Sequence, residues 1–572
     1  MQRYRLRLDS ALMHTVLLIA VCLPYCINLG KSSIWDANEA YYAETPREML
    51  KTGNYLAPHF NFHPWAQKPP LTYWVILVSY KLFGVNEFAV RLPSALAAIG
   101  MLLFSYGIGR LLFSPNAGLL SAMMLSTTAR VFILARRFPI DILLLFFLTG
   151  TLFSLVKALR KNSKSSWALA YVCAAFGFLT KGPVALFIPA CAYLLWGLRR
   201  RQRISESHPL MGAAIFLCIV LPWYVYIYSV YGWIYISPLF LRTNLGRFAA
   251  EPVGHSRNLF YYFSVYAVDF FPWSILSLFA VYLLWHHRRQ EPVLRSLSFG
   301  LPIIWCASTF VLFSISKNKQ EYYIAPMYPV AAVLVAGVMD RIAGSKERGD
   351  CAREWGRSVR LSLWMWMYGL PALSLLFLSS IVPYIFSSFM PGIAAVLHYA
   401  PSVLLVGGAL SLIWSIRRRG HVLSFLALII PLWAIYMMCG LSYLPALESF
   451  RPVKRFCQII EAQSSTNDEV GFFGTALPSM AFYLRRPIFE EDSPERMLRR
   501  FQSEKRVFCV LSQEDFGYFP DTQDLKVYIL DRRPRFSVRF GALMNAGYFP
   551  GEELLLVSNR PSSQKTTGRS GP

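Results

Sequence analysis

Long apolar runs recur along most of the chain and decide what it can fold into. There are about thirteen of these runs, and most are about 17 to 25 residues long. A helix of that length is long enough to cross a hydrocarbon core of about 30 Å. Only helices and closed barrels satisfy every backbone hydrogen bond in lipid. The runs therefore predict a polytopic α-helical membrane protein with about 13 transmembrane helices. The spans are expected near residues 12–29, 92–112, 119–134, 140–159, 167–179, 184–198, 210–228, 267–285, 301–316, 324–342, 361–385, 396–416 and 422–444.

Composition agrees with a lipid environment. Of 572 residues, 55% are hydrophobic and 16% are charged, a balance that suits lipid rather than water. The formal net charge of +25 could indicate nucleic-acid binding, but the Lys and Arg residues fall mostly in short clusters between the apolar runs. Such clusters set membrane topology, so we expect membrane lipids and no nucleic acid among the partners.

The basic clusters also predict an orientation. With a cytoplasmic amino terminus, all of them fall on the cytoplasmic side, at residues 157–164, 199–203, 286–289, 341–360 and 417–419. An odd number of spans then exports the C-terminal tail. The first apolar run shows no convincing cleavage site, so we interpret it as a retained span.

Changes in pattern divide the chain into three regions. Residues 1–445 form the predicted transmembrane domain, with exported loops near 31–87 and 231–265. Residues 446–559 are expected to form a small exported α/β domain, and residues 560–572 a disordered tail. We expect helices at 453–461 and 495–503 and strands at 470–473, 507–511, 525–530 and 554–557. The apolar segment 72–83 is too short to span and is expected at the outer interface.

The ten cysteines show no C-x-x-C spacing, and most of them lie within apolar runs. They are typical of small core residues rather than of a metal or disulfide framework. Cys457 and Cys509 lie in the polar C-terminal region and could pair, which the sequence leaves open.

The two exported loops carry the candidate chemistry, since long ordered loops usually carry function. In the second loop, Arg247 and His255 lie among aromatic residues that could simply form an interfacial belt. The first loop is a predicted working surface, because charged residues follow one another closely there: Asp36, Glu39, Glu44, Arg47, Glu48 and Lys68.

Several cations fall at the outer ends of spans, against the topology rule. A cation in such a place loses solvation, so an anion such as phosphate is expected to compensate it; snorkelling to lipid headgroups is the alternative. Asp141, four residues after Arg137, could pair with that arginine or face a polar cavity. Carboxylates that orient a nucleophile and cations that stabilise a departing phosphate fit group transfer from a phospholipid carrier. The cations are Lys68, Arg136, Arg137, Lys181, Lys317 and Lys319.

A series of motifs over roughly the first 340 residues resembles a known family. The motifs are WDANEAYYAETPREMLKTGNYLAPHFN, QKPPLTYW, SYKLFGVNEFAVRLPSAL, FPIDILLLFF, FLTKGPVAL, TNLGRF, FFPWS and SKNKQEYYIAPMYP. They look like those of the membrane glycosyltransferases that include the aminoarabinose transferases of lipid A and, more distantly, the protein O-mannosyltransferases. The resemblance implies a GT-C-type fold, an undecaprenyl-phosphate-linked sugar as donor, and transfer on the periplasmic face of a bacterial inner membrane.

The resemblance also assigns residues. Glu39 matches the glutamate of the family's Asp-Glu pair, and Asp141 matches its second aspartate. Asn38 stands where the first acid of the pair is usual, and Gln67 where a glutamate often precedes Lys-Pro. Asn cannot serve as a base, so either Glu39 or Asp36 supplies the carboxylate, or the acceptor is itself ionised, as a phosphate on lipid A is. The change at position 67 leaves a divalent cation possible and metal dependence open.

Our hypothesis is a glycosyltransferase that moves a sugar from undecaprenyl phosphate to a lipid A-type or other envelope acceptor. A protein O-glycosyltransferase, a transporter or flippase of lipid-linked sugars, and a structural scaffold are the alternatives; a transporter calls for an inverted repeat and broken spans, and the sequence shows neither. The expected catalytic residues are Glu39, Asp36 and Asp141. The expected ligands of the carrier phosphate are Lys68, Arg137, Lys181, Lys319, Tyr322, Tyr323 and Arg247, and the acceptor-side candidates are Tyr42, Glu44 and His255.

Overall fold

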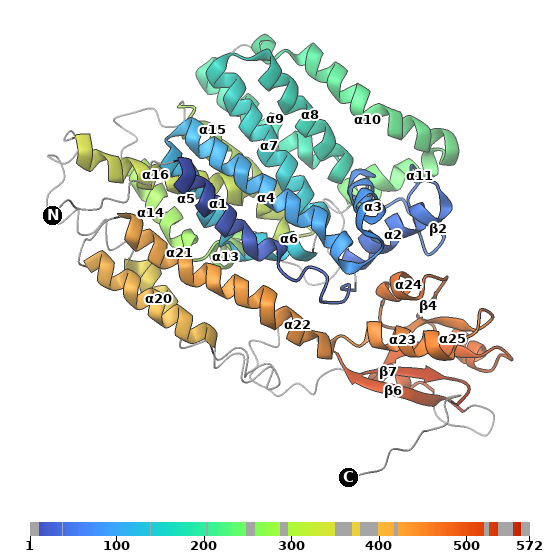
Figure 1. Ribbon diagram of the computed structural model, residues 1–572. Coiled ribbons are helices and arrows are strands. Elements are labelled where there is room, and N and C mark those ends of the chain that lie inside the picture. Colours follow the sequence, from blue (N-terminus) through green and yellow to red (C-terminus); the bar gives the residue numbers. More distant parts are fainter. Residues whose placement is uncertain are drawn as a thin grey trace.

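Helices make up one large bundle, and most of the strands gather in a smaller unit beside one end of it (Figure 1). This computed structural model describes residues 11–36, 38–137, 139–201, 204–246, 258–286, 296–348, 369–377, 399–416, 421–519, 526–535 and 553–561. Within those residues, five helical segments are long and apolar enough to cross a membrane, or up to seven if each bent pair counts as one span. The chain is therefore a multi-pass membrane protein.

The five long segments follow the expected apolar runs. They are α4 (Glu87–Leu112), α7 (Pro139–Lys161), α10 (Pro209–Tyr231), the segment Glu321–Arg341 that joins the 3₁₀ helix η5 (Glu321–Met327) to α16 (Tyr328–Arg348), and Phe425–Phe450, which includes α21 (His421–Met438). Other expected runs form shorter or less apolar helices. These are α1 (Ala11–Cys26), α8 (Lys164–Lys181), α9 (Val184–Arg200), α15 (Gly300–Ile315) and α20 (Tyr399–Ile416). Most of the run 361–385 lies outside the described residues, so the count of about thirteen stays a prediction.

Two apolar runs are broken, which the sequence reading missed. The run 119–134 forms α5 (Pro115–Ser126) and α6 (Ala129–Arg137), bent by 65°, and α13 (Tyr261–Asp269) meets α14 (Trp273–His286) at 114°. At the first break, the Tyr25 hydroxyl donates to the Ser126 carbonyl at 3.0 Å and the Tyr436 hydroxyl to the Thr127 carbonyl at 3.3 Å. A break without Pro or Gly is stable in the bundle because neighbouring helices satisfy the freed carbonyls.

The first loop (residues 31–87) folds into an ordered unit at one end of the bundle. It contains α2 (Asn38–Thr52), a short hairpin of β1 (His59–Phe60) and β2 (His63–Pro64), and α3 (Leu71–Phe83). α3 has 13 residues, as the short apolar segment predicted. It buries Tyr73, Ile76 and Tyr80 in a core shared with α2, so the unit has its own apolar centre.

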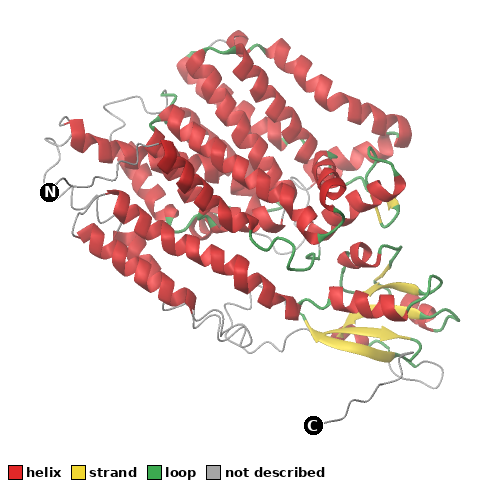
Figure 2. Cartoon of the chain, viewed as in Figure 1, coloured by secondary structure: helices red, strands yellow, loops and turns green. Residues whose placement is uncertain are grey.

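The C-terminal unit is a mixed sheet with helices, shown by the yellow arrows in Figure 2. Its strand order is β4-β3-β5-β7-β6; β3 pairs in parallel with β4 and β5, whereas β7 pairs antiparallel with β5 and β6. Expected strands and helices are present as β3 (Glu469–Phe473), β5 (Val507–Ser512), β7 (Glu553–Ser558), α23 (Val453–Gln463) and α25 (Pro494–Phe501).

Two details of this sheet differ from the expectation. The edge strand β4 (Phe489–Glu491) has three residues, too few for a pattern to reveal. β6 (Tyr528–Pro534) begins later than expected and extends further, because it pairs along the whole of β7, from Tyr528 opposite Ser558 to Pro534 opposite Glu553. Cross-strand pairing, rather than local apolarity, sets its limits.

The two C-terminal cysteines are separated by the sheet. Cys457 packs in the core that contains α23, and Cys509 packs in the core on the other face with α25. Both are buried free thiols. The possible Cys457–Cys509 disulfide is therefore absent. Successive side chains of β5 point to opposite faces of the sheet, and Cys509 points to the face away from α23, which carries Cys457.

The first loop and the C-terminal unit share a core. Phe60 is buried among Val453, Phe456 and Ile488, and Tyr41 and Trp65 pack against the same cluster. Beside them, the Asn61 side chain donates to the Ile488 carbonyl at 2.7 Å and accepts from the Ile488 N–H at 2.9 Å. The loop that carries Asp36, Glu39 and Glu44 is thus held between the bundle and the sheet.

Candidate active site

Asp141 and Lys181 form an ion pair at the loop end of the bundle. Asp141 lies in the first turn of α7 and Lys181 at the end of α8. Their side chains are 8% and 17% exposed, and the ammonium lies 5.3 Å from the ring centres of both Tyr322 and Tyr323, at the start of η5. Four predicted site residues from three distant segments therefore meet here. The partner of Asp141 is Lys181 and not Arg137, which was one of the two expectations.

A second group surrounds Trp35. The guanidinium of Arg137 lies 3.6 Å from the centre of one indole ring and that of Arg451 lies 4.0 Å from it. Stacking of this kind offsets part of the cost of desolvating a cation. Arg137 is the last residue of α6, and Asp141 follows four residues later in α7. The two groups therefore lie at the same end of the bundle.

Glu39 lies beside this second group, where its hydrogen bonds stabilise the backbone of the first loop. Its carboxylate accepts from Arg91 Nε at 2.6 Å and from Arg91 Nη2 at 3.1 Å, and from the Trp35 N–H at 2.8 Å. Arg91 also donates to the carbonyls of Leu29, Ser32 and Ser33. The ion pair is nearly enclosed, with side chains 4% and 1% exposed. It fixes the backbone that presents Trp35 and Asp36.

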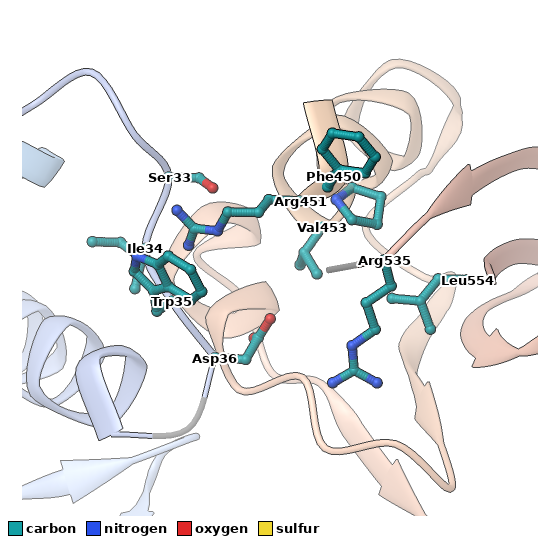
Figure 3. Close-up of a pocket in the computed structure, with 10 residues that line it drawn as sticks. Ser33, Ile34, Trp35, Asp36, Phe450, Arg451, Val453, Arg535 and Leu554 are labelled. Carbon is teal, nitrogen blue, oxygen red and sulfur yellow. The ribbon is translucent and has the colours of Figure 1, made fainter. Parts of the chain in front are cut away.

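Asp36 faces the C-terminal unit instead of the ion pairs of the bundle. Its Oδ1 accepts from the Ser479 N–H at 3.1 Å and from the Ser479 hydroxyl at 2.5 Å, at the start of α24 (Ser479–Leu484). Burial raises the pKa of Asp36, while the hydrogen bonds from Ser479 and the charges of Arg451 and Arg535 oppose that rise. Asp36 also lines a cavity of about 150 Å³ between the loop and the sheet (Figure 3).

The remaining acidic candidates lie inside the first loop. Glu44 accepts from Arg47 at 2.6 and 2.5 Å, and Glu48 accepts from the Phe62 N–H at 2.9 Å. Burial and the neighbouring Glu44 raise the pKa of Glu48 to about 8. Tyr42 is buried and stacks on Tyr73, with ring centres 5.5 Å apart. These residues support the fold of the loop.

The predicted cations differ in exposure. Lys68 is half-buried just before α3, and Lys317 is exposed. Lys319 is 8% exposed and donates to the Ser316 carbonyl at 2.6 Å. Arg136 donates to the carbonyls of Pro24 and Ile27, so it helps to anchor the end of α1.

The second loop is described in part. It contains α11 (Trp233–Ser237) and the π-helix η2 (Pro238–Gly246), whereas Arg247 and His255 lie outside the described residues. Across the described ranges, no group of three or more His, Cys, Asp and Glu side chains is placed to hold a metal ion.

Sequence reasoning missed a third charged group, inside the bundle. Arg130 of α6 donates to both carboxylate oxygens of Asp269, at 2.8 and 2.9 Å, and the Tyr328 hydroxyl donates to the same carboxylate at 2.8 Å. Arg130 also lies 3.9 Å from Glu321 of η5. Arg91, Arg130 and Asp269 all interrupt apolar stretches of sequence, and intramembrane charges of this kind are the signal that could have identified them.

The chain is similar in sequence to known proteins over part of its length. Residues 67–226 match the sequence model of the family described as dolichyl-phosphate-mannose-protein mannosyltransferase. The undecaprenyl phosphate-alpha-4-amino-4-deoxy-L-arabinose arabinosyl transferase of Pseudomonas aeruginosa strain PAO1 is 30% identical over 337 residues, which cover 57% of this chain and 60% of that protein. A protein of Aquifex aeolicus is 31% identical over 330 residues, 57% of this chain and 63% of its own length. The matches thus span under two thirds of these relatives.

Solved structures show the fold. The crystal structure of ArnT from Cupriavidus metallidurans bound to undecaprenyl phosphate superposes with a TM-score of 0.77 at 20% identity, covering 96% of this chain and 99% of that one. Its apo form gives a TM-score of 0.74. The chain therefore has the fold of this solved transferase, and over 57% of its length it is similar in sequence to a protein named as an arabinosyl transferase.

Proposed function

We propose that this protein transfers a sugar from an undecaprenyl-phosphate carrier to a lipid A-type or other envelope acceptor, on the periplasmic face of a bacterial inner membrane. The observation that carries the proposal is the group of Asp141, Lys181, Tyr322 and Tyr323 at the loop end of the bundle. The Lys181 ammonium is positioned by the Asp141 carboxylate and by the rings of Tyr322 and Tyr323. Related proteins named as undecaprenyl-phosphate arabinosyl transferases support the choice of donor.

Lys181 is the proposed phosphate ligand. A carrier phosphate that approaches the pair competes with Asp141 for the ammonium, and charge-assisted hydrogen bonds to phosphate are strong. In the transfer step, the acceptor oxygen forms a bond to the anomeric carbon while the bond from that carbon to the carrier phosphate breaks. The phosphate leaves with the electron pair and gains negative charge, which the ammonium stabilises.

The acceptor is proposed to be ionised before it binds. Each candidate base already has a partner: Glu39 pairs with Arg91, Asp141 with Lys181, and Asp36 accepts from Ser479. Asn38, in the place of the family's first acid, is exposed at the start of α2 and cannot accept a proton as a carboxylate does. An acceptor phosphate needs orientation and no base, which favours a lipid A-type acceptor over a protein hydroxyl.

Sugar transfer by the purified protein tests this proposal. Lys181→Met should lower kcat/KM about 100-fold or more, since loss of one group that stabilises developing charge typically costs that much. Lys164→Met is the matched control, because Lys164 is exposed at the opposite end of the same helix. The assay supplies an undecaprenyl-phosphate sugar with lipid A or a peptide acceptor, and mass spectrometry detects the product. Wild-type turnover in Lys181→Met would refute the assignment, and peptide glycosylation alone would favour the protein O-glycosyltransferase.

A further inference from the structure

The two broken spans meet at a charged pair inside the bundle. Arg130 lies in the first turn of α6, after the bend from α5, and Asp269 is the last residue of α13, before the bend to α14. Their side chains are 13% and 9% exposed. Beside them, the Trp273 indole at the start of α14 donates to the Thr127 hydroxyl at 3.1 Å. An ionisable pair within a membrane bundle costs free energy and usually marks a function.

This pair contacts both ends of η5. Glu321, the first residue of η5, has a carboxylate oxygen 3.9 Å from Nη1 of Arg130. Tyr328 directly follows η5, and its hydroxyl donates to the Asp269 carboxylate at 2.8 Å. Because one ion pair makes both contacts, the start and the end of a helix of seven residues are tied to α6 and α13.

Further contacts strengthen the hold on η5. The Tyr262 hydroxyl of α13 donates to the carbonyl of Gln320, just before η5, at 3.1 Å. The ring of Tyr328 is fully buried and stacks on Phe270, with ring centres 5.7 Å apart and ring planes at 10°. A ring enclosed in this way keeps its hydroxyl directed at the Asp269 carboxylate.

The same short helix carries two aromatic residues of the candidate site. Tyr322 and Tyr323 lie between the tied ends, with ring centres 5.3 Å from the Lys181 ammonium. A 3₁₀ helix has poorer hydrogen-bond geometry than an α-helix, and runs longer than about four residues are uncommon. η5 therefore depends on its tertiary contacts, and a shift of η5 would move both rings relative to the ammonium.

We propose that Arg130 and Asp269 are positioning residues for Lys181. They hold η5 in place, and through Tyr322 and Tyr323 they keep the ammonium where a carrier phosphate would meet it. The consequence for sugar transfer rests on the proposed function, whereas the position of the ammonium is a property of the fold. A displacement of about 1 Å can cost about 100-fold in rate, so the pair should matter for transfer although it lies outside the candidate site.

Acylation of lysine side chains by acetic anhydride tests the position of the ammonium. The purified full-length protein is labelled in a neutral detergent, and mass spectrometry gives the rate at Lys181 relative to the exposed Lys164. Lys181 should react slowly in the wild type, because a carboxylate and two rings shield it. Arg130→Met and Tyr328→Phe should each raise the ratio of the two rates about fivefold or more, as expected for the loss of at least one buried hydrogen bond.

Two further variants separate positioning from a merely structural role. Tyr266→Phe is the matched control for Tyr328→Phe, because Tyr266 also lies next to the pair, on α13, but its hydroxyl lies 2.8 Å from the Ser277 hydroxyl; the labelling ratio should equal that of the wild type. Arg130→Lys keeps a charge beside Asp269 and should bring the ratio back towards the wild-type value. In the transfer assay, kcat/KM should fall about tenfold in Tyr328→Phe and stay unchanged in Tyr266→Phe.

The labelling result decides the proposal without any sugar donor. An unchanged ratio in Tyr328→Phe, an equal rise in Tyr266→Phe, or no recovery in Arg130→Lys relative to Arg130→Met would overturn it. Tyr328→Phe keeps the charged pair, so the test holds even where Arg130→Met does not fold. If the ratio rises as expected while Lys181→Met transfers sugar like the wild type, the positioning of Lys181 stands and the proposed function fails.

Discussion

At the residue scale, each carboxylate chosen for catalysis has a specific partner. Glu39 is enclosed by Arg91, Asp141 by Lys181, and Asp36 meets Ser479. The gathering of Lys and Arg candidates was predictable, because these cations go against the topology rule under the predicted orientation. The partners were not, since Arg91 and Ser479 come from segments whose position beside the loop depends on packing.

The Glu39–Arg91 pair should support stability. Glu39→Gln leaves the guanidinium of Arg91 buried without its counter-charge, and breaking a buried pair in this way typically costs about 3 to 5 kcal/mol. Thermal unfolding of the purified protein should show a midpoint several degrees lower. Glu469→Gln is the control, because its ion pair with Arg500 is about a third exposed and such pairs contribute about 1 kcal/mol or less. Equal midpoints for the two variants would contradict the structural role of Glu39.

At the element scale, α2 combines a buried ion pair with a buried acid. Glu44 and Arg47 pair within one turn, while Glu48 lies next to Glu44 with its Oε1 unpartnered among the described residues. The sequence predicted that these charged residues form a working surface. Packing against α3 and the hairpin instead turns these charges inward, as the 0% exposure of both Glu44 and Glu48 shows.

Glu48 should make stability depend on pH. Its pKa in the folded protein is about 8, above the usual 4.5, so folding favours the protonated form. This contribution is complete below pH 4.5 and is lost as the pH rises to 8. Glu48→Gln removes it, so the variant should gain stability relative to the wild type as pH rises through that window. Unfolding midpoints at pH 5, 6, 7 and 8 measure this gain, with the exposed Glu495→Gln as control; a gain that does not grow with pH would contradict the assignment.

At the scale of the whole molecule, the C-terminal unit acts as a support for the first loop. Phe60 enters its core, Lys454 pairs with Glu87 at 2.6 Å, and the Tyr483 hydroxyl accepts from the Ile34 N–H at 2.7 Å. These contacts hold the first loop between the helix bundle and the C-terminal unit. The sequence predicted an α/β unit there, but its attachment to residues 31–87 joins segments that are hundreds of positions apart.

Loss of the Phe60 side chain should therefore lower the local stability of both the first loop and the C-terminal unit. Phe60→Ala leaves a cavity in the shared core and typically costs about 3 to 5 kcal/mol. Hydrogen exchange should become faster in α23 and α24 and also in residues 59–65. Phe519→Ala is the matched control, because Phe519 is equally buried in the core on the other face of the sheet. It should speed exchange near α25 without affecting the loop, and the same pattern in both variants would disprove the shared core.

The sequence alone determined the class of protein, and it predicted which charged residues are candidates for the chemistry. The length of an apolar run relative to the bilayer thickness, the placement of charges and the short length of α3 are local properties. They can be found from the sequence without knowledge of the fold. The tertiary structure decided which charges meet, where α5 and α6 break, and that Cys457 and Cys509 lie on opposite faces. Those outcomes depend on which helices and strands become neighbours, and neighbours are set by packing over the whole chain.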